Sequence, residues 1–415
     1  MKKIKIGVFG AGRGADIAKN FMLLNCDIVA LCDDRKDKVA EAIKKMNCGS
    51  PAIYDDFDKF IGHDMDAVII ANFFHEHAKY AVKCIEKGLH VFSECISNGT
   101  MAEGARLIRT AEKHPDVIYM LAENYPQMIF NREIKRICDT GTLGKFLYAE
   151  GEYNHPVAPG DEGFRKNFEY FEKHWRHYIP GTYYITHSLG PVMYATGASP
   201  VRVTAFASFS PYEDNTATAS YVGDRLASIM TQNDDGSVFR VTGWAKLGGH
   251  HNSYRVCGTK GQVENLRGTD KIMLRYNRWD IPKGYEAINS YVPEWNDKDE
   301  SIIKKSGHGG ADYLTARMFT ECIRNNKQPE HPFNVYSAVN MSSVAILAHR
   351  SMLEGGKPYD IPDFKSEESR KAYESDRLTP FYGSDGAKPN IPCCSKTDYT
   401  PGDKQLEEYR KLFIG

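Results

Sequence analysis

A glycine-rich turn near the N-terminus constrains the fold of this chain more than any other segment. The apolar run over residues 4–9 leads into Gly10-Ala11-Gly12-Arg13-Gly14-Ala15, and a helix is predicted over residues 13–24. A second strand over residues 27–32 then ends at the acidic Asp33. A strand, a glycine turn, a helix and a strand that ends in an acidic residue predict, in that order, a dinucleotide-binding βαβ unit.

The residues of this turn have separate predicted roles. Gly10 allows the tight turn, and Gly12 lets the backbone approach a pyrophosphate. Ala15 is a small residue that allows the helix to pack on the strand. Arg13 and Gly14 lie between them, where the free N–H groups of the helix N-terminus face the phosphates.

The acidic residue after the second strand indicates which dinucleotide binds. Asp33 is expected to bind both hydroxyls of the adenosine ribose and to repel a 2′-phosphate, which favours NAD over NADP. Arg35 and Lys36 soften that preference without reversing it. The alternative is a structural glycine turn beside an exposed aspartate.

Two domains and an extension are predicted along the chain. Residues 1–122 alternate strands with helices, and the short apolar runs at 67–71, 90–92 and 117–121 predict a doubly wound parallel sheet. Residues 123–365 predict a second α/β domain with a large, open and mostly antiparallel sheet. Its strands are expected at 147–153, 201–209, 216–222, 227–232, 238–245 and 254–257, and its helices at 130–140, 311–325 and 337–353. Residues 366–415 are charged and contain several prolines, so an irregular extension with a short helix near 405–412 is expected.

The composition excludes several classes of partner. The net charge is −1 and 26% of the residues are charged, with no long block of one sign, which argues against nucleic acid and anionic membranes. The chain contains no apolar run of the roughly 18 residues that a membrane span needs, and its N-terminus enters a strand without the apolar stretch of a signal peptide. The ten cysteines are scattered without the spacing of a zinc site, so a reduced cytoplasmic protein without a metal is expected.

Further motifs resemble those of the Gfo/Idh/MocA superfamily. Residues 71–77 match its fourth-strand segment, Glu94-Cys95-Ile96 falls on its Glu-Lys-Pro motif, and Gly144-Lys145 matches the turn into its second domain. The match covers residues 1 to about 355, and it implies a Rossmann domain, a second α/β domain and a nicotinamide cofactor between them. Family members commonly use the open sheet to form dimers or tetramers, so a homo-oligomer is expected. Beyond the glycine turn and Asp33, the cofactor contacts that the resemblance implies are Asn72, His75, Glu94, Cys95 and Asn124.

The departures from this superfamily concern its acid/base groups. Its ordinary dehydrogenases use the lysine of the Glu-Lys-Pro motif, with an aspartate and a histidine in the second domain. Here these three positions are Cys95, Thr186 and Gly190, although the NAD site is intact. Cys95 is interpreted as a small residue that fills the place of lysine, and a redox thiol is the alternative. His75 and His77 are spaced like a metal pair, but the superfamily places them at the start of a helix.

One subgroup fits the remaining residues better. Tyr184-Ile185-Thr186-His187-Ser188-Leu189-Gly190-Pro191 resembles the Tyr-Pro-Thr-His-Gly-Leu-Gly-Pro stretch of the NAD-dependent glycosidases typified by the α-N-acetylgalactosaminidases. Trp175-Arg176, Glu123-Asn124, Tyr153 and the segment from His308 to Tyr313 match further positions of that subgroup. Ile185 and Ser188 depart from its pattern, which leaves the sugar and the anomer open.

The resemblance implies a redox-neutral reaction on a small glycoside. C3 is oxidised transiently, a base removes the C2 proton, the C1 substituent is eliminated, water adds, and the hydride returns to the sugar. His187 is expected to handle the proton at C3, Tyr184 to remove the C2 proton, and Tyr153 to protonate the leaving group. Glu123 binds hydroxyls or water in this scheme. The expected substrate contacts are Trp175, Arg176 and His308.

Each of these assignments has a bland alternative. His187 could be a core histidine bonded to the backbone, and Tyr184 and Tyr153 could be packing residues. Trp175 could be a buried tryptophan, and His308 could cap a helix. Two other functions also stay open, namely an ordinary NAD-dependent sugar or polyol dehydrogenase and an NAD-binding sensor without turnover.

Overall fold

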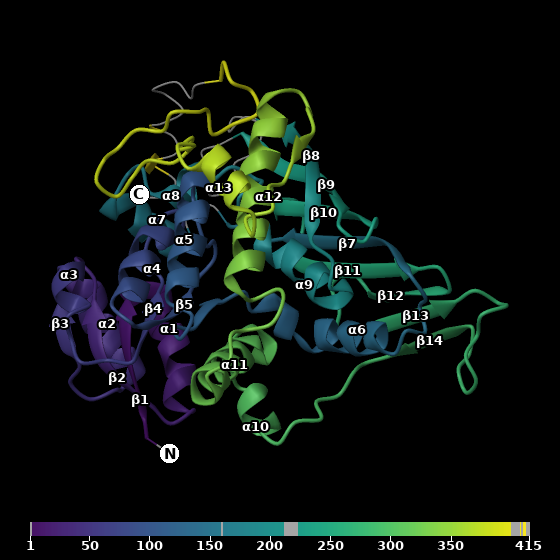
Figure 1. Cartoon of the computed structure of the whole chain (residues 1–415), viewed down its shortest axis with the longest axis horizontal. Coiled ribbons are helices and arrows are strands. Elements are labelled where there is room, and N and C mark those ends of the chain that lie inside the picture. The colour runs from purple at the N-terminus through teal and green to yellow at the C-terminus, as the bar shows by residue number, and fades with distance from the viewer. Residues whose placement is uncertain (1, 159–160, 211–222, 400–406, 408–409, 412–415) are drawn as a thin grey trace. The chain divides into compact units, whose positions relative to one another are not determined.

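The computed structural model describes residues 2–158, 161–210, 223–399, 407, 410 and 411 (Figure 1). These residues form two compact units, each assembled from separate stretches of the chain. Unit 1 contains Met1–Ile129, Glu294–Val339 and Phe364–Asp376, and unit 2 contains Phe130–Pro293, Asn340–Asp363 and Arg377–Gly415. The strand predicted over 216–222 and most of the helix predicted over 405–412 lie outside the described residues.

Unit 1 is built on a six-stranded parallel sheet with the order β3-β2-β1-β4-β5-β6. Its strands are β1 (Ile4–Phe9), β2 (Cys26–Cys32), β3 (Ala52–Tyr54), β4 (Ala67–Ile70), β5 (His90–Ser93) and β6 (Tyr119–Leu121). Its helices are α1 (Ala11–Met22), α2 (Lys36–Met46), α3 (Phe57–Phe60), α4 (His77–Glu86), α5 (Met101–Lys113), α10 (Glu300–Ile303), α11 (Ala311–Asn325) and α13 (Glu367–Tyr373), with the short helices η1 (Tyr125–Gln127) and η3 (His308–Gly310). The strand order reverses between β1 and β4, which is the point where such sheets place ligands.

The core of unit 1 joins segments that are far apart in sequence. Every residue of β4 is fully buried, as expected for a strand covered on both faces. α11 packs against α1, and the Phe319 ring meets the edge of Phe21 at 6.0 Å between centroids. α13 begins the stretch that the sequence predicts to be irregular, and Arg370 on this helix pairs with Glu112 on α5 at 2.5 Å.

Unit 2 is built on a nine-stranded sheet with the order β14-β13-β12-β11-β7-β10-β9-β8-β15. Only β7 and β10 pair in parallel, and the other pairs are antiparallel. The strands are β7 (Phe146–Asn154), β8 (Pro200–Phe209), β9 (Asp224–Asn233), β10 (Val238–Ala245), β11 (His251–Gly258), β12 (Gly261–Asn265), β13 (Ile272–Tyr276), β14 (Ile288–Tyr291) and β15 (Tyr359–Asp360). The predicted α/β class, with a parallel and a mostly antiparallel sheet, is confirmed.

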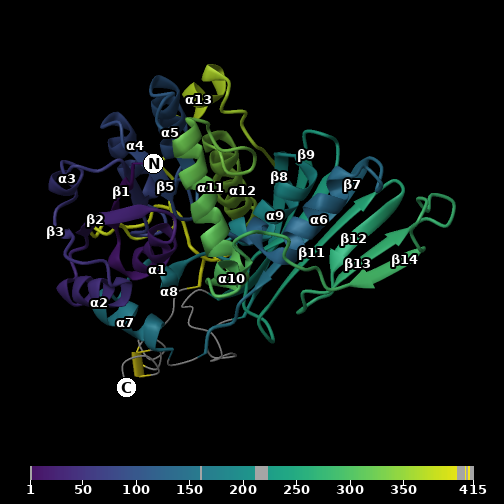
Figure 2. The ribbon, with the colours of Figure 1, turned by 90° about the horizontal axis from the view of Figure 1, so that it is seen from below.

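Helices cover one face of this sheet (Figure 2). α9 (Thr186–Thr196) packs on β7, β10 and β11, and α6 (Ile129–Asp139) places Phe130 against Tyr254 of β11 at 5.9 Å. The short helices α7 (Glu162–Tyr170) and α8 (Trp175–Tyr178) precede α9, and α12 (Val335–Leu353) begins in unit 1 and continues into unit 2. No helix in the described part of the chain is long and apolar enough to span a membrane.

Candidate functional site

The glycine turn of unit 1 has the geometry of a dinucleotide-binding turn. Gly10 has a φ of +95°, and a Cβ there would lie 2.3 Å from a backbone carbonyl oxygen of the β4–α4 turn. A Cβ on Gly14 would lie 2.7 Å from Val8 Cγ1, so the helix and the strand make their close contact at Gly14. The sequence assigns this contact to Ala15, which is the next residue and is also buried. A Cβ on Gly12 would meet no atom within 4 Å, so the backbone there borders open space.

Asp33 and Asn72 lie at the ends of β2 and β4, on either side of this turn. The Asp33 carboxylate accepts hydrogen bonds from the backbone N–H of Ala11 at 2.7 Å and of Arg35 at 2.9 Å. Burial raises the pKa of Asp33, and these two hydrogen bonds act in the opposite direction. The Oδ1 atom of Asn72 is buried and has no hydrogen-bond partner among the described residues. A buried acceptor without a donor and an open glycine turn fit a bound dinucleotide.

The two histidines of the β4–α4 turn occupy buried positions. His77 is fully buried, and its Nδ1 donates to the backbone oxygen of Ile96 at 2.9 Å. Burial lowers the pKa of His77, which favours the neutral ring. His75 is also buried, with Nε2 at 3.9 Å from Glu76 Oε1. No group of three or more His, Cys, Asp or Glu side chains in the part of the chain that the structure describes is arranged to hold a metal ion.

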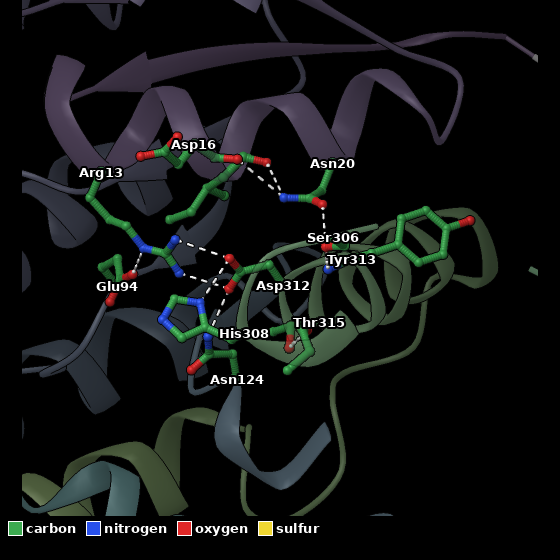
Figure 3. A network of polar contacts seen from close by, with 12 residues as sticks. Arg13, Asp16, Asn20, Glu94, Asn124, Ser306, His308, Asp312, Tyr313 and Thr315 are labelled. Atoms are coloured by element: carbon green, nitrogen blue, oxygen red, sulfur yellow. Dashed lines mark hydrogen bonds and ion pairs between the residues drawn. The ribbon is translucent and has the colours of Figure 1, made fainter. Parts of the chain in front are cut away.

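A network of charged residues surrounds Arg13 in the first turn of α1 (Figure 3). Arg13 donates from Nε to Glu94 Oε1 at 2.9 Å and from Nη1 and Nη2 to the Asp312 carboxylate at 3.1 and 2.8 Å. Asp312 also accepts from Asn124 Nδ2 at 2.7 Å and from His308 Nδ1 at 3.0 Å. The guanidinium therefore ties α1 to the end of β5 and to the start of α11, with a carboxylate on each side of it.

Asp312 is the centre of this network, and the sequence did not single it out. Burial alone would raise the pKa of Asp312, but the hydrogen bonds from His308 and Arg13 outweigh it and hold the pKa well below the usual range. Asp312 therefore remains a carboxylate at neutral pH. The sequence places Asp312 in the segment from His308 to Tyr313 that resembles the subgroup, but an acidic residue in the first turn of a helix is common and gave it no role of its own.

The thiol at the lysine position of the Glu-Lys-Pro motif contacts a buried carboxylate. Cys95 Sγ donates to Glu123 Oε2 at 3.2 Å, and Glu123 Oε1 accepts from the backbone N–H of Tyr125 at 3.0 Å. The backbone N–H of Cys95 donates to Glu94 Oε2 at 2.9 Å. The Cys95 thiol thus donates a hydrogen bond to Glu123, which is fully buried.

Three predicted catalytic residues meet in unit 2, where they form what we term the tyrosine–histidine cluster. The ring of Tyr153 on β7 lies 5.6 Å from that of Tyr184 and 4.9 Å from that of His187 on α9. Tyr184 and His187 lie 5.1 Å apart. Tyr153 and His187 are buried, and Tyr184 is half-buried. Two phenols and an imidazole that converge in this way can hold and move protons at neighbouring atoms of one substrate.

Local features of α9 place His187 in the cluster. Pro191, one turn further along α9, has no N–H to give to the carbonyl oxygen of His187. The Tyr254 hydroxyl donates to that oxygen instead, at 2.5 Å. A Cβ on Gly151 would lie 2.0 Å from the backbone oxygen of Ser188, so glycine at this position lets the first turn of α9 rest directly on β7.

Trp244 and two histidines extend the cluster and were not predicted. His155 stacks on Tyr153 at 5.7 Å, and His250 lies edge-on to His155 at 4.6 Å. The Trp244 ring lies 5.9 Å from Tyr184, and its Nε1 donates to the His155 carbonyl oxygen at 2.7 Å. Because alternate residues of a strand share a face, the spacing of Tyr153 and His155 was a signal that could have found His155. Trp244 is brought beside Tyr153 only by the pairing of β10 with β7.

The predicted substrate residues are divided between the two units. Trp175 and Arg176 lie on α8 in unit 2, with the guanidinium 4.5 Å from the centre of the tryptophan ring. His308 lies in unit 1, where its ring is exposed and contacts Asp312. An arginine over an aromatic ring offers both a flat surface and hydrogen-bond donors to a sugar.

Comparisons with known proteins agree with this architecture. Residues 4–122 match the family model of the Gfo/Idh/MocA oxidoreductases, described as an NAD-binding Rossmann fold, and residues 133–371 match the model of the glycosyl hydrolase 109 C-terminal domain. A glycosyl hydrolase family 109 protein of Streptomyces niveus is 26% identical over 94% of this chain and 81% of its own length. An alpha-N-acetylgalactosaminidase of Shewanella oneidensis is 25% identical over 88% of this chain and 85% of its own.

Solved structures show the same fold. Levoglucosan dehydrogenase in complex with NADH and L-sorbose is similar with a TM-score of 0.70 and 17% identity, over 88% of this chain and all of that one (100%). Scyllo-inositol dehydrogenase from Lactobacillus casei, with bound NAD(H) and scyllo-inositol, has a TM-score of 0.65 and 18% identity, over 87% of this chain and 99% of that one. The predicted resemblance is confirmed: the chain belongs to glycosyl hydrolase family 109, with an N-terminal NAD-binding Rossmann domain of the Gfo/Idh/MocA type.

Proposed function

We propose that this protein is an NAD-dependent glycosidase that cleaves a small glycoside without net oxidation or reduction. The observation that supports this proposal best is the tyrosine–histidine cluster, in which Tyr153, Tyr184 and His187 lie within 6 Å of one another by ring centroids. A dehydrogenase needs one group to manage the proton of the oxidised hydroxyl. Elimination also needs a base for the C2 proton and an acid for the leaving group, and the cluster offers three such groups.

Residues of unit 1 are proposed to hold NAD. The backbone of the Gly10–Gly14 turn would hold the pyrophosphate and Asp33 the adenosine ribose. Asn72 and His75 after β4, Glu94 and Cys95 after β5, and Asn124 after β6 would hold the nicotinamide half. The chemistry that NAD supplies when bound is a reversible hydride transfer, so C3 of the sugar would be a ketone for part of the cycle.

The side chains of the cluster have separate proposed roles. His187 takes the proton of the C3 hydroxyl during oxidation and returns it when the hydride comes back. Tyr184 removes the C2 proton, which the neighbouring ketone acidifies, and the electron pair forms the C1–C2 double bond as the C1 substituent leaves. Tyr153 gives that substituent its proton. Addition of water to C1 and a proton to C2 completes a balanced hydrolysis.

Other predicted residues bind the sugar or water in this proposal. Glu123 holds hydroxyls or a water molecule through its carboxylate, which the Cys95 thiol orients. Trp175 and Arg176 offer a stacking face and a hydroxyl clamp, and His308 offers a further hydrogen-bond group. The relative from Shewanella oneidensis suggests α-N-acetylgalactosaminides as the first substrates to test.

Aryl glycosides test the proposal directly. The purified protein with NAD is mixed in D₂O with a panel of p-nitrophenyl glycosides that includes the α-N-acetylgalactosaminide. The expected result is release of nitrophenol with no net NADH, and deuterium at C2 of the released sugar. Stoichiometric NADH without release would instead establish an ordinary sugar or polyol dehydrogenase, and neither signal on the whole panel would favour an NAD-binding sensor.

A phenol-to-phenyl substitution tests the role of Tyr184. Tyr184→Phe keeps the ring but removes the proposed base, so we expect nitrophenol release to fall by roughly a hundredfold or more. NAD affinity, measured by calorimetry, should not change. Tyr359→Phe on β15 is the matched control and should keep full activity. Tyr184→Phe with unaltered release would remove Tyr184 from the mechanism.

A further inference from the structure

The C-terminal extension, here residues 377–399, is an integral part of unit 2. It lies beyond residue 371, where the match to the family's C-terminal domain ends. Phe381 and Cys394 within it are buried to 1% and 5% exposure, as core side chains are. The extension is therefore packed into the unit that carries the tyrosine–histidine cluster.

One end of the extension supports the residue that precedes Tyr184. The Phe381 ring meets the Tyr183 ring edge-on at 4.8 Å, and both rings are buried. On another side, Tyr183 lies 5.7 Å from His349, whose Nε2 donates to the carbonyl oxygen of Pro392 at 2.7 Å. Burial lowers the pKa of His349 to about 4, so the neutral ring makes this hydrogen bond at neutral pH. The extension thus reaches Tyr183 both directly and through His349.

The other end reaches Tyr184 through a buried stack of polar and aromatic side chains. Ser395 donates to the Asp224 carboxylate from Oγ at 2.5 Å and from its backbone N–H at 2.8 Å. Lys246 Nζ donates to the backbone oxygen of Asp224 at 3.3 Å and lies 4.7 Å from the centre of the Trp244 ring. Trp244 in turn lies 5.9 Å from Tyr184.

This stack depends on its neighbours because it buries charge. Asp224 and Lys246 have 0% and 2% exposure, and burial lowers the pKa of Lys246 to about 7. A buried ammonium is stable only where acceptors and an aromatic face replace water. Here the first acceptor is the backbone of Asp224, whose own carboxylate is held by Ser395. A change at Ser395 is thus expected to move the whole stack.

We propose that the C-terminal extension is a positioning element for Tyr184, which it holds through Tyr183 on one side and through the stack of Asp224, Lys246 and Trp244 on the other. An effect of the extension on catalysis rests on the proposed function, because Tyr184 is the proposed base at C2. The coupling of the extension to the position of Tyr184 does not rest on it and can be measured without a substrate.

The test combines a substrate-free readout with kinetics. Tyr184 is replaced by 3-fluorotyrosine, and its fluorine resonance is recorded in the full-length protein with NAD. Ser395→Ala removes the hydroxyl that holds Asp224, Ser395→Thr restores a hydroxyl, and Lys388→Ala changes an exposed residue of the same extension. Ser395→Ala is expected to shift or broaden the resonance and to lower kcat about tenfold with little change in KM. Ser395→Thr should recover both readouts, and Lys388→Ala should match the parent protein.

The outcomes separate this inference from the proposed function. A parent protein that releases no nitrophenol refutes the glycosidase, and the fluorine resonance then decides the inference alone. If Ser395→Ala does not give folded protein, Phe381→Leu, which keeps most of the apolar volume against Tyr183, serves in its place with the same expectation. An unchanged resonance in whichever variant folds overturns the inference, as does a normal kcat in an active enzyme.

Discussion

Asp312→Asn tests whether the Arg13 network stabilises unit 1. The substitution keeps the shape of the side chain but removes the charge that accepts two hydrogen bonds from Arg13. Loss of one partner from a buried ion pair costs about 3–5 kcal/mol. The Arg13 side chain is 30% exposed and keeps Glu94 as a partner, so we expect the lower end of that range, about 3 kcal/mol. For a unit of this size that cost lowers the melting temperature by roughly 9 °C.

A double-mutant cycle measured by urea unfolding isolates the pair. Asp312→Asn, Arg13→Gln and the double variant should give a coupling free energy of at least about 2 kcal/mol. Asp16→Asn is the matched control on the same helix, because the Asp16–Lys45 pair is 41–42% exposed and its loss should cost under about 1 kcal/mol. A coupling below about 0.5 kcal/mol between Arg13 and Asp312 would refute the reasoning.

The pH dependence of unfolding gives an independent check on Asp312. Its pKa in the folded protein is held below the usual range, so the folded state binds fewer protons than the unfolded state at low pH. The stabilisation is therefore complete above about pH 4 and is lost as the pH falls, at up to about 1.4 kcal/mol per pH unit. The free energy of unfolding of Asp312→Asn should fall less steeply than that of the parent below about pH 4. Equal slopes would show that Asp312 gains nothing from its partners.

Two further substitutions test single hydrogen bonds at the candidate site. Cys95→Ala removes the donor to Glu123 and should lower kcat about fivefold, whereas Cys95→Ser should keep most of the activity because a hydroxyl also donates. Equal kcat values in the two variants would show that the thiol does not orient Glu123. Tyr254→Phe leaves the His187 carbonyl oxygen without its donor and should cost about 1–3 kcal/mol of stability in urea unfolding as well as lowering kcat. A Tyr254→Phe variant as stable and active as the parent would show that this hydrogen bond does not fix His187.

Most of unit 1 was predictable because its signals are local. β1, β4 and β5 are short apolar runs, the glycine turn marks the start of α1, and Asp33 marks the end of β2. β3 was missed because it is only three residues long and its central side chain, Ile53, is exposed, so it lacks the longer buried run that marks the other strands. The packing of α11 on α1 brings residues around 311–325 into the N-terminal unit, and no local pattern could predict that contact because it depends on side chains far apart in the chain.

The residues of the candidate site also fall into those with a local sequence signal and those that depend on the tertiary fold. Tyr184 and His187 were recognisable from the sequence because both belong to one motif at the start of α9. The roles of Asp312 and Trp244 were not, because an acidic residue in a helix and a tryptophan in a strand are ordinary features until the tertiary fold gives them neighbours. The role of Ser395 could not be predicted either, because it depends on a hydrogen bond to Asp224. Asp224 is a buried carboxylate that no pattern of the sequence marks.

The charges around Cys95 offer a physical reason why a lysine is dispensable at its position. An ammonium there would neutralise the neighbouring carboxylates, but Glu94 is already paired with Arg13, and Glu123 accepts hydrogen bonds from a thiol and a backbone N–H. Unit 1 can therefore keep its carboxylates satisfied without a lysine. If the proton chemistry belongs to His187, Tyr184 and Tyr153, as proposed, a lysine at position 95 would supply a fourth ionisable group that the redox-neutral cycle does not need.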